Sequence, residues 1–183
     1  MDTAYGPPTD VLGQTVPVHQ LAVRTDRAVV AVQHVVAFSQ GCLIVLHLAA
    51  RRGSLSTSDW ERLQGSHLGA DPEIAAADAA SLTFGVRFPD GTNATTTEHP
   101  GRNPSRLAGR PEPPMLVETD TDSSSDDEVY RSNQRLWLWP LPPPGPFEFV
   151  VEWRGMGIAP TAITLDGDAI VRAAPHALPL WAS

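Results

Sequence analysis

The sequence predicts a mainly β protein, folded as an antiparallel β-sandwich of the immunoglobulin-like or jelly-roll-like kind. Apolar and polar residues alternate along several short stretches, as they do in strands with one buried face. Turn residues separate these stretches at short intervals. Only two segments, around 56–80 and 168–174, have the composition of short helices. Short strands separated by turns fit either an antiparallel sandwich or a barrel, and a sandwich is favoured because the strong strands each have one apolar and one polar face.

The first half of the chain predicts a strand at 16–24, followed by a hairpin of 28–38 and 42–50 around the turn "SQG". In the first arm, strict alternation places these residues on one face: Val30, Val32, His34, Val36 and Phe38. In the second arm, the shared face is Cys42, Ile44, Leu46 and Leu48. Polar residues interrupt 28–50 too often for a membrane-spanning helix, which needs about 20 continuous apolar residues.

The middle of the chain alternates between one clear strand and polar segments. Residues 51–80 are polar and alanine-rich, which predicts an excursion with short helical turns. Residues 81–91 predict a strand that ends in a Pro-Asp-Gly turn. Residues 92–113 lack an apolar period and predict a mobile loop. A short strand at 115–118 and an acidic, serine-rich tip at 119–128 follow.

The stretch "RLWLWPLPPPGPFEFVVEW", residues 135–153, predicts two buried strands joined by a proline corner. Proline has no N–H to donate, so 140–146 cannot continue a ladder. A stiff crossing between strands is favoured over an exposed polyproline peptide for a partner. Both faces of 136–139 are apolar, which places this strand near the middle of the fold. Near the C-terminus, Asp168 is expected to cap a short helix, and Trp181 to dock onto the sheets.

The expected organisation is a flexible N-terminus at 1–15 and a single domain at 16–183, with loop insertions at 51–80, 92–113 and 119–128. "FPDG", the acidic tip, "LWLWPLPPPGPFEFVVEW", a Thr/Asp strand and a short C-terminal helix together resemble a family of uncharacterised actinobacterial proteins. The resemblance covers roughly residues 16–182. It implies one compact cytoplasmic domain, and it supplies no catalytic motif.

Charge and cysteine content restrict the classes of partner. The net charge is −8, and all 13 basic residues are arginine. An acidic chain without a basic stripe is a poor candidate for binding nucleic acid or an anionic membrane, so neither is expected. The single cysteine, Cys42, excludes an internal disulfide framework. The N-terminal residues lack the pattern of a secretory signal, which favours the cytoplasm.

The sequence offers three candidate sites, and it predicts no catalytic residue and no cofactor. Trp137, Trp139 and Trp153 could form an aromatic platform for a sugar or another flat ligand. His34 and His47 could line a pocket if their strands are neighbours. Oxygen ligands for calcium are clustered in the acidic segment, although the spacing departs from a calcium loop. These ligands are Asp120, Asp122, Asp126, Asp127 and Glu128.

Three functions remain open at this point. The first is a non-enzymatic interaction or assembly module that binds another protein or forms a homo-oligomer, most simply a dimer. The second is a small-ligand binder or enzyme with a pocket between the sheets. The third is a calcium- or carbohydrate-binding module. The first is favoured because apolar strands are abundant and the reagent-like motifs of enzymes are missing from the sequence.

Overall fold

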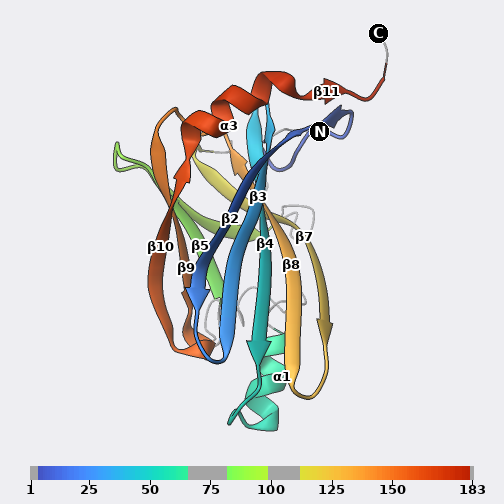
Figure 1. Ribbon diagram of the computed structural model, residues 1–183, viewed down its shortest axis with the longest axis vertical. Helices are drawn as coiled ribbons and strands as arrows, with labels where there is room; N and C mark the ends of the chain where they lie inside the picture. Colours follow the sequence, from blue (N-terminus) through green and yellow to red (C-terminus); the bar gives the residue numbers. More distant parts are fainter. Residues whose placement is uncertain (1–3, 66–81, 99–111, 182–183) are drawn as a thin grey trace.

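A single curled sheet of nine strands forms most of the computed structural model, which describes residues 4–65, 82–98 and 112–181 (Figure 1). All neighbouring strands are antiparallel except β6 and β7, which are parallel. In their order across the sheet, the strands are β10 (Ile158–Asp166), β9 (Pro146–Trp153), β5 (Leu82–Arg87), β6 (Asn93–Glu98), β7 (Met115–Ser125), β8 (Val129–Trp139), β4 (Gly41–Arg51), β3 (Ala28–Phe38) and β2 (Gln14–Arg24).

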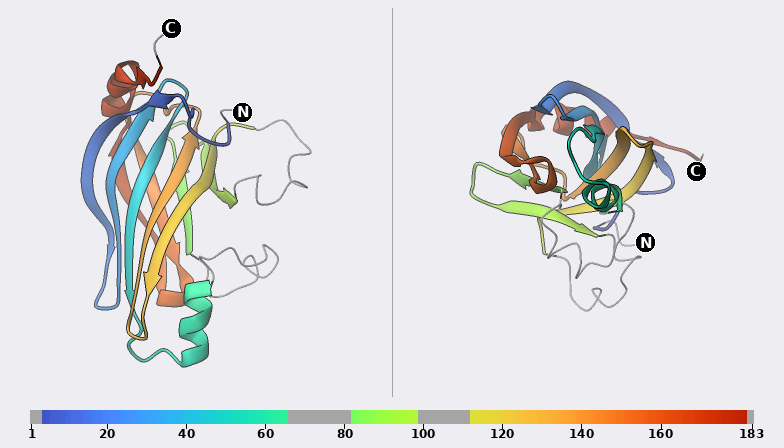
Figure 2. Two further views of the ribbon diagram at one scale, coloured as in Figure 1. Left: turned by 90° about the vertical axis from the view of Figure 1, so that its right-hand side faces the viewer. Right: turned by 90° about the horizontal axis from the view of Figure 1, so that it is seen from below.

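The sheet curls until its two outer strands, β10 and β2, lie side by side (Figure 1). No ladder joins these two strands in the described part of the chain, so the ring is nearly closed. Seen end on, the strands surround a common interior (Figure 2). The predicted mainly β class is therefore confirmed, but two facing antiparallel sheets are replaced by one mixed, barrel-like sheet. Alternation along a strand shows only that the strand has an inner and an outer face. Strands of a sandwich and strands of a barrel both have these two faces, so the pattern does not distinguish the two architectures.

Strands β4, β5 and β9 supply the inward faces that alternation predicts. Phe84 of β5 stacks on Phe149 of β9, with ring centroids 5.8 Å apart. Just beyond the end of β5, Phe88 packs against Phe147 of β9, with ring centroids 5.3 Å apart. Ile44, Leu46 and Leu48 of β4 face the same interior and have no exposed surface. The three strands thus contribute one continuous core, which lies inside the curled sheet.

Strand β3 departs from strict alternation. Val32 is fully buried, as expected, but the next buried residue is Val35 rather than His34. The register against β4 shifts between Val32 and His34, which is the mark of a β-bulge. The extra residue reverses which positions face the core, so the predicted face of this arm is wrong beyond Val32. His34, Val36 and Phe38 point to the outer face.

Helix α1 (Thr57–Gly65) covers one end of the sheet (Figure 1). Trp60 and Leu63 insert into the core and are 3% and 1% exposed. The indole N–H of Trp60 donates to the carbonyl oxygen of Asp126 in the β7–β8 turn, at 3.3 Å. The Ser56 hydroxyl accepts from the Asp59 backbone N–H, as a helix cap does. A short helix within the 51–80 excursion is therefore confirmed; residues 66–81 lie outside the described residues.

Helix α3 (Gly167–Ala173) covers the opposite end. Its N-terminal cap is Asp166, whose carboxylate accepts from the Ala169 backbone N–H at 3.0 Å. Asp168 was expected in this role, but it already lies inside the helix. Ile170 packs into the core and is 1% exposed. The described residues also contain two 3-10 helices, η2 (Arg154–Met156) and η3 (Ala174–His176).

The proline segment connects β8 to β9, which are separated in the sheet by β7, β6 and β5. It therefore crosses the end of the sheet beside α3, as the predicted stiff crossing requires. Leu141 donates its backbone N–H to the Gln40 carbonyl oxygen at 3.1 Å. Gly167 donates to the Gly145 carbonyl oxygen at 3.0 Å. These bonds fix the crossing at both ends.

Three segments expected as loops or flexible chain contain regular structure. Residues 93–98 form β6, while residues 99–111 lie outside the described residues. Strand β7 continues to Ser125, so most of the acidic 119–128 segment belongs to a ladder with β8. Within the N-terminal 1–15 segment, β1 (Val11–Leu12) pairs with β11 (Leu178–Pro179), and residues 14 and 15 already belong to β2.

Candidate functional site

The three tryptophans of the expected aromatic platform lie on different faces of the sheet. Trp153 is fully buried in the main core. Trp137 is fully buried in a second cluster on the outer face, together with Phe38 and Val117. Its ring meets that of Phe38 edge on, at 5.7 Å and 69°. Trp139 is half-buried beside this cluster. The structure therefore does not bring the tryptophans together on an exposed surface where a sugar could stack.

His34 and His47 lie on neighbouring strands and both face outward. A ring nitrogen of His47, Nδ1, lies 2.9 Å from Oδ1 of Asn133 on β8. Partial burial lowers the pKa of His34, and the nearby positive charges of His19 and Arg135 lower it further. Each histidine thus has a local polar environment on the outer face.

The acidic residues proposed as calcium ligands are spread along β7 and its turn. Asp120 forms an ion pair with Arg135, with 2.6 Å between Oδ2 and Nη1. The Asp126 carboxylate accepts from the backbone N–H groups of Glu128 and Val129, and these bonds lower the pKa of Asp126. Within residues 4–65, 82–98 and 112–181, no three His, Cys, Asp or Glu side chains are placed to hold a metal ion.

Three hollows of about 490, 430 and 380 Å³ indent the described surface. The first lies beside the Pro-Asp-Gly turn and the start of β9, and the third lies along β5 and β6. Histidine and tryptophan are absent from the linings of these three hollows, so none of the three is a pocket built from His34 or His47. The second hollow is lined by several arginines.

An exposed apolar surface lies where the N-terminal and C-terminal segments meet. Leu12, Leu178, Leu180 and Trp181 are 60%, 61%, 49% and 75% exposed. We call these four residues the apolar end surface. Strands β1 and β11 hold two of them in register, with Leu12 opposite Leu178. The Leu180 backbone N–H continues this pairing by donating to the Asp10 carbonyl oxygen at 2.8 Å.

The β1–β11 pair, which carries the apolar end surface, packs against the second cluster through Val11. Val11, on the other side of β1 from the exposed Leu12, packs against the cluster that contains Phe38, Val117 and Trp137. The β1–β11 pair is therefore anchored to the outer face near the α3 end of the sheet (Figure 1). Docking of Trp181 onto the sheets was the sequence expectation, and it is wrong, because this indole is the most exposed large apolar group in the described chain.

The sequence contained a signal for this surface, which our sequence reasoning missed. "LPLW" places Leu178 and Leu180 two residues apart, so both can face one side of an extended segment. A terminal apolar segment can equally be a core strand, and only the exposed fractions distinguish the two.

Comparison with protein-family models, curated proteins and solved structures finds no match to this chain. None of the helices in the described segments is long and apolar enough to cross a membrane.

Proposed function

We propose that this protein is a non-enzymatic assembly module that forms a homodimer through the apolar end surface. The observation that supports the proposal is the concentration of exposed apolar side chains at one place. Among the described residues, five large hydrophobic side chains are exposed, and four of them belong to the apolar end surface. Scattered exposed leucines are ordinary, whereas a contiguous group is typical of an interaction site.

Association through the open edges of the curled sheet is less favourable than association through this surface. The outer strand β2 contains Pro17 and two register shifts, and β10 contains Pro160 and a further shift. Proline and bulges remove donors and twist an edge away, which disfavours pairing with a strand of another molecule. The apolar end surface, by contrast, offers side chains rather than backbone groups.

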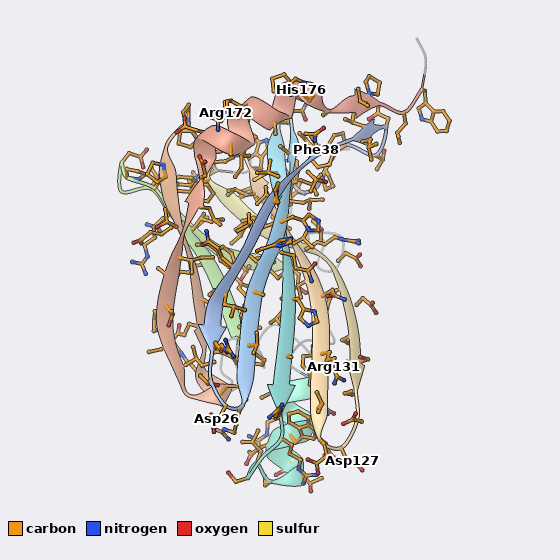
Figure 3. All side chains as sticks on the ribbon, viewed as in Figure 1. Asp26, Phe38, Asp127, Arg131, Arg172 and His176 are labelled. Atoms are coloured by element: carbon orange, nitrogen blue, oxygen red, sulfur yellow. The ribbon has the colours of Figure 1, made fainter. Side chains whose placement is uncertain are left out.

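The charge distribution is compatible with a second copy of the chain as the occupant of this surface. The chain has a net charge of −8, so two copies repel each other unless they meet where charge is low. Residues 11–12 and 178–181 contain no charged side chain. The acidic β7–β8 turn with Asp127 lies at the far end of the molecule from Arg172 and His176 of the α3 region (Figure 3). A dimer joined at the α3 end keeps the two acidic turns apart.

Sedimentation velocity from micromolar to millimolar protein tests the proposal. The wild-type chain should pass from monomer to dimer within this range. Trp181→Ser and Leu180→Ser should each weaken the dissociation constant at least about tenfold, because each removes apolar burial from both copies. Leu21→Ser is the matched control: Leu21 is also 49% exposed but lies on β2, outside the surface. It should leave the dissociation constant unchanged.

Two results would contradict the homodimer. One is a wild-type chain that stays monomeric at millimolar concentration. The other is an equal loss of association in Leu21→Ser, because the contact would then not depend on the apolar end surface. Both serine variants change exposed side chains, so their urea unfolding midpoints should match the wild type, and this comparison separates lost association from lost folding.

A further inference from the structure

The hollow at the α1 end of the sheet is lined by arginine side chains from four separate parts of the sequence. These are Arg24 of β2, Arg27 of the β2–β3 turn, Arg51 of β4 and Arg131 of β8. The hollow has a volume of about 430 Å³. Arg131 and Asp26 mark this end of the sheet in Figure 3, opposite Arg172. Four of the 13 basic residues of an acidic chain therefore meet at one place.

The strand register explains how these arginines converge. Arg24 lies opposite Val29, Val29 lies opposite Ala49, and Ala49 lies opposite Arg131. These four residues form one row across β2, β3, β4 and β8, on the outer face. The Cα atoms of the two arginines are three strand spacings apart, roughly 14 Å. Val29 and Ala49 lie between the two arginines, and their small side chains form the floor of a trough.

The other two arginines are held at the rim of the same trough. Arg51 is two residues from Ala49 along β4, so it points to the same outer face. Its backbone N–H donates to the Arg27 carbonyl oxygen at 2.8 Å, which ties the β2–β3 turn to the end of β4. The Arg27 stem lies against Gly53, where a built Cβ would be 3.0 Å from Cδ. This contact holds Arg27 beside the trough.

These guanidinium groups lack paired carboxylates in the described residues. The four ion pairs of the described chain involve other arginines: Arg62, Arg87, Arg135 and Arg154. Asp26 is the only carboxylate in the lining of the hollow. Arg131 is also close enough to Asp126 to help lower the pKa of that exposed carboxyl, after the two backbone N–H groups. Four arginines thus line the trough with one carboxylate, and Asp126 beside Arg131 offsets part of their positive charge.

We propose that this arginine trough binds a small phosphate compound, with a diphosphate group lying over Val29 and Ala49. Guanidinium groups present planar pairs of N–H donors that match phosphate oxygens, and charge-assisted bonds of this kind are the strong ones. Two phosphoryl groups would lie between the arginines of β2 and β8, with Arg27 and Arg51 at the side. The bound anion would also relieve the repulsion among four like charges. The site is at the other end of the sheet from the dimer surface and does not depend on it.

Isothermal titration calorimetry of the full chain with sodium pyrophosphate at low salt tests the trough. The wild-type chain should bind one pyrophosphate per chain in a saturable way. Arg24→Gln and Arg131→Gln should each weaken binding at least tenfold, which corresponds to about 1.4 kcal/mol. Arg172→Gln is the control, because it removes the same charge from the exposed surface of α3 at the opposite end. It should change affinity less than twofold.

Three outcomes would overturn the proposal. The first is no saturable binding at millimolar pyrophosphate. The second is an equal loss of affinity in Arg172→Gln, which would make the binding a general effect of charge. The third is tighter binding of citrate than of pyrophosphate, which would assign the trough to carboxylates. All three arginines are exposed, so the variants should fold, and unchanged urea midpoints in the absence of ligand verify this.

Discussion

Replacing Val35 with alanine tests the bulge that decides which side of β3 faces the core. Val35 is fully buried, whereas its neighbour His34 is half-buried on the outer face. If β3 alternated strictly, His34 would face the core and Val35 would lie on the outer face. A pair of variants, Val35→Ala and His34→Ala, therefore distinguishes the structure with the bulge from a straight strand.

The expected magnitude follows from what each variant removes. Alanine at position 35 deletes two buried methyl groups, which are worth about 0.8 kcal/mol each in transfer free energy. The cavity left behind adds about 24 cal/mol per Å³. We therefore expect Val35→Ala to lower the free energy of unfolding by about 2–3 kcal/mol. His34→Ala changes a partly exposed side chain and should cost less than about 0.5 kcal/mol.

Urea unfolding followed by tryptophan fluorescence is a suitable assay, because Trp137 and Trp153 are fully buried and become exposed on unfolding. With a slope of about 2–3 kcal/mol per molar urea, Val35→Ala should lower the midpoint by about 1 M. The slope itself should stay the same in both variants. A larger loss in His34→Ala than in Val35→Ala would refute the bulge and restore the straight strand.

Two further predictions concern the α3 end and the buried thiol. Gly167→Ala should lower the free energy of unfolding by about 1–3 kcal/mol, because a Cβ there would overlap the carbonyl oxygens of Gly145 and Pro143. Urea unfolding measures this loss, and Asp168→Ala, at the next and exposed position, should cost far less; equal losses would contradict the close packing. Burial raises the pKa of the Cys42 thiol well above its usual range. Cys42 should therefore react with a maleimide only after unfolding, and stability should decline as pH rises above about 8.5, where only the unfolded chain releases this proton. Rapid labelling of the native chain would show that the thiol is accessible.

Much of the local structure follows from the sequence, and the candidate surfaces follow from it only in part. Alternation identified the inward faces of β4, β5 and β9, because a side chain's face depends only on its position along a regular strand. The serines before α1 suit a helix cap by composition, and the structure shows that Ser56 takes this role. Asp166 was missed as the cap of α3, because Asp168 is an equally good cap by composition and only the helix boundary decides between them.

The candidate sites were harder to predict, because each depends on residues far apart in the chain. Trp137 and Trp153 belong to the same aromatic stretch, yet the sheet places them in different clusters. The four arginines of the trough are separated by up to about a hundred residues, and only the register of β2, β3, β4 and β8 brings them together. Arg51 and Arg52 are the only adjacent basic residues in the sequence, and this pair alone does not predict the site.

The sequence by itself determined that this chain forms strands, where most of them turn, and that the prolines at 140–146 make a crossing. These properties depend on the two-residue period of a strand and on the backbone limits of proline and glycine, which act within a few residues. The tertiary structure decided that one sheet curls on itself, that β3 changes face at a bulge, and that distant arginines and apolar termini gather at opposite ends. Those features depend on which strands pair and in what register, and pairing joins backbone groups whose separation along the chain leaves no local pattern in the residues.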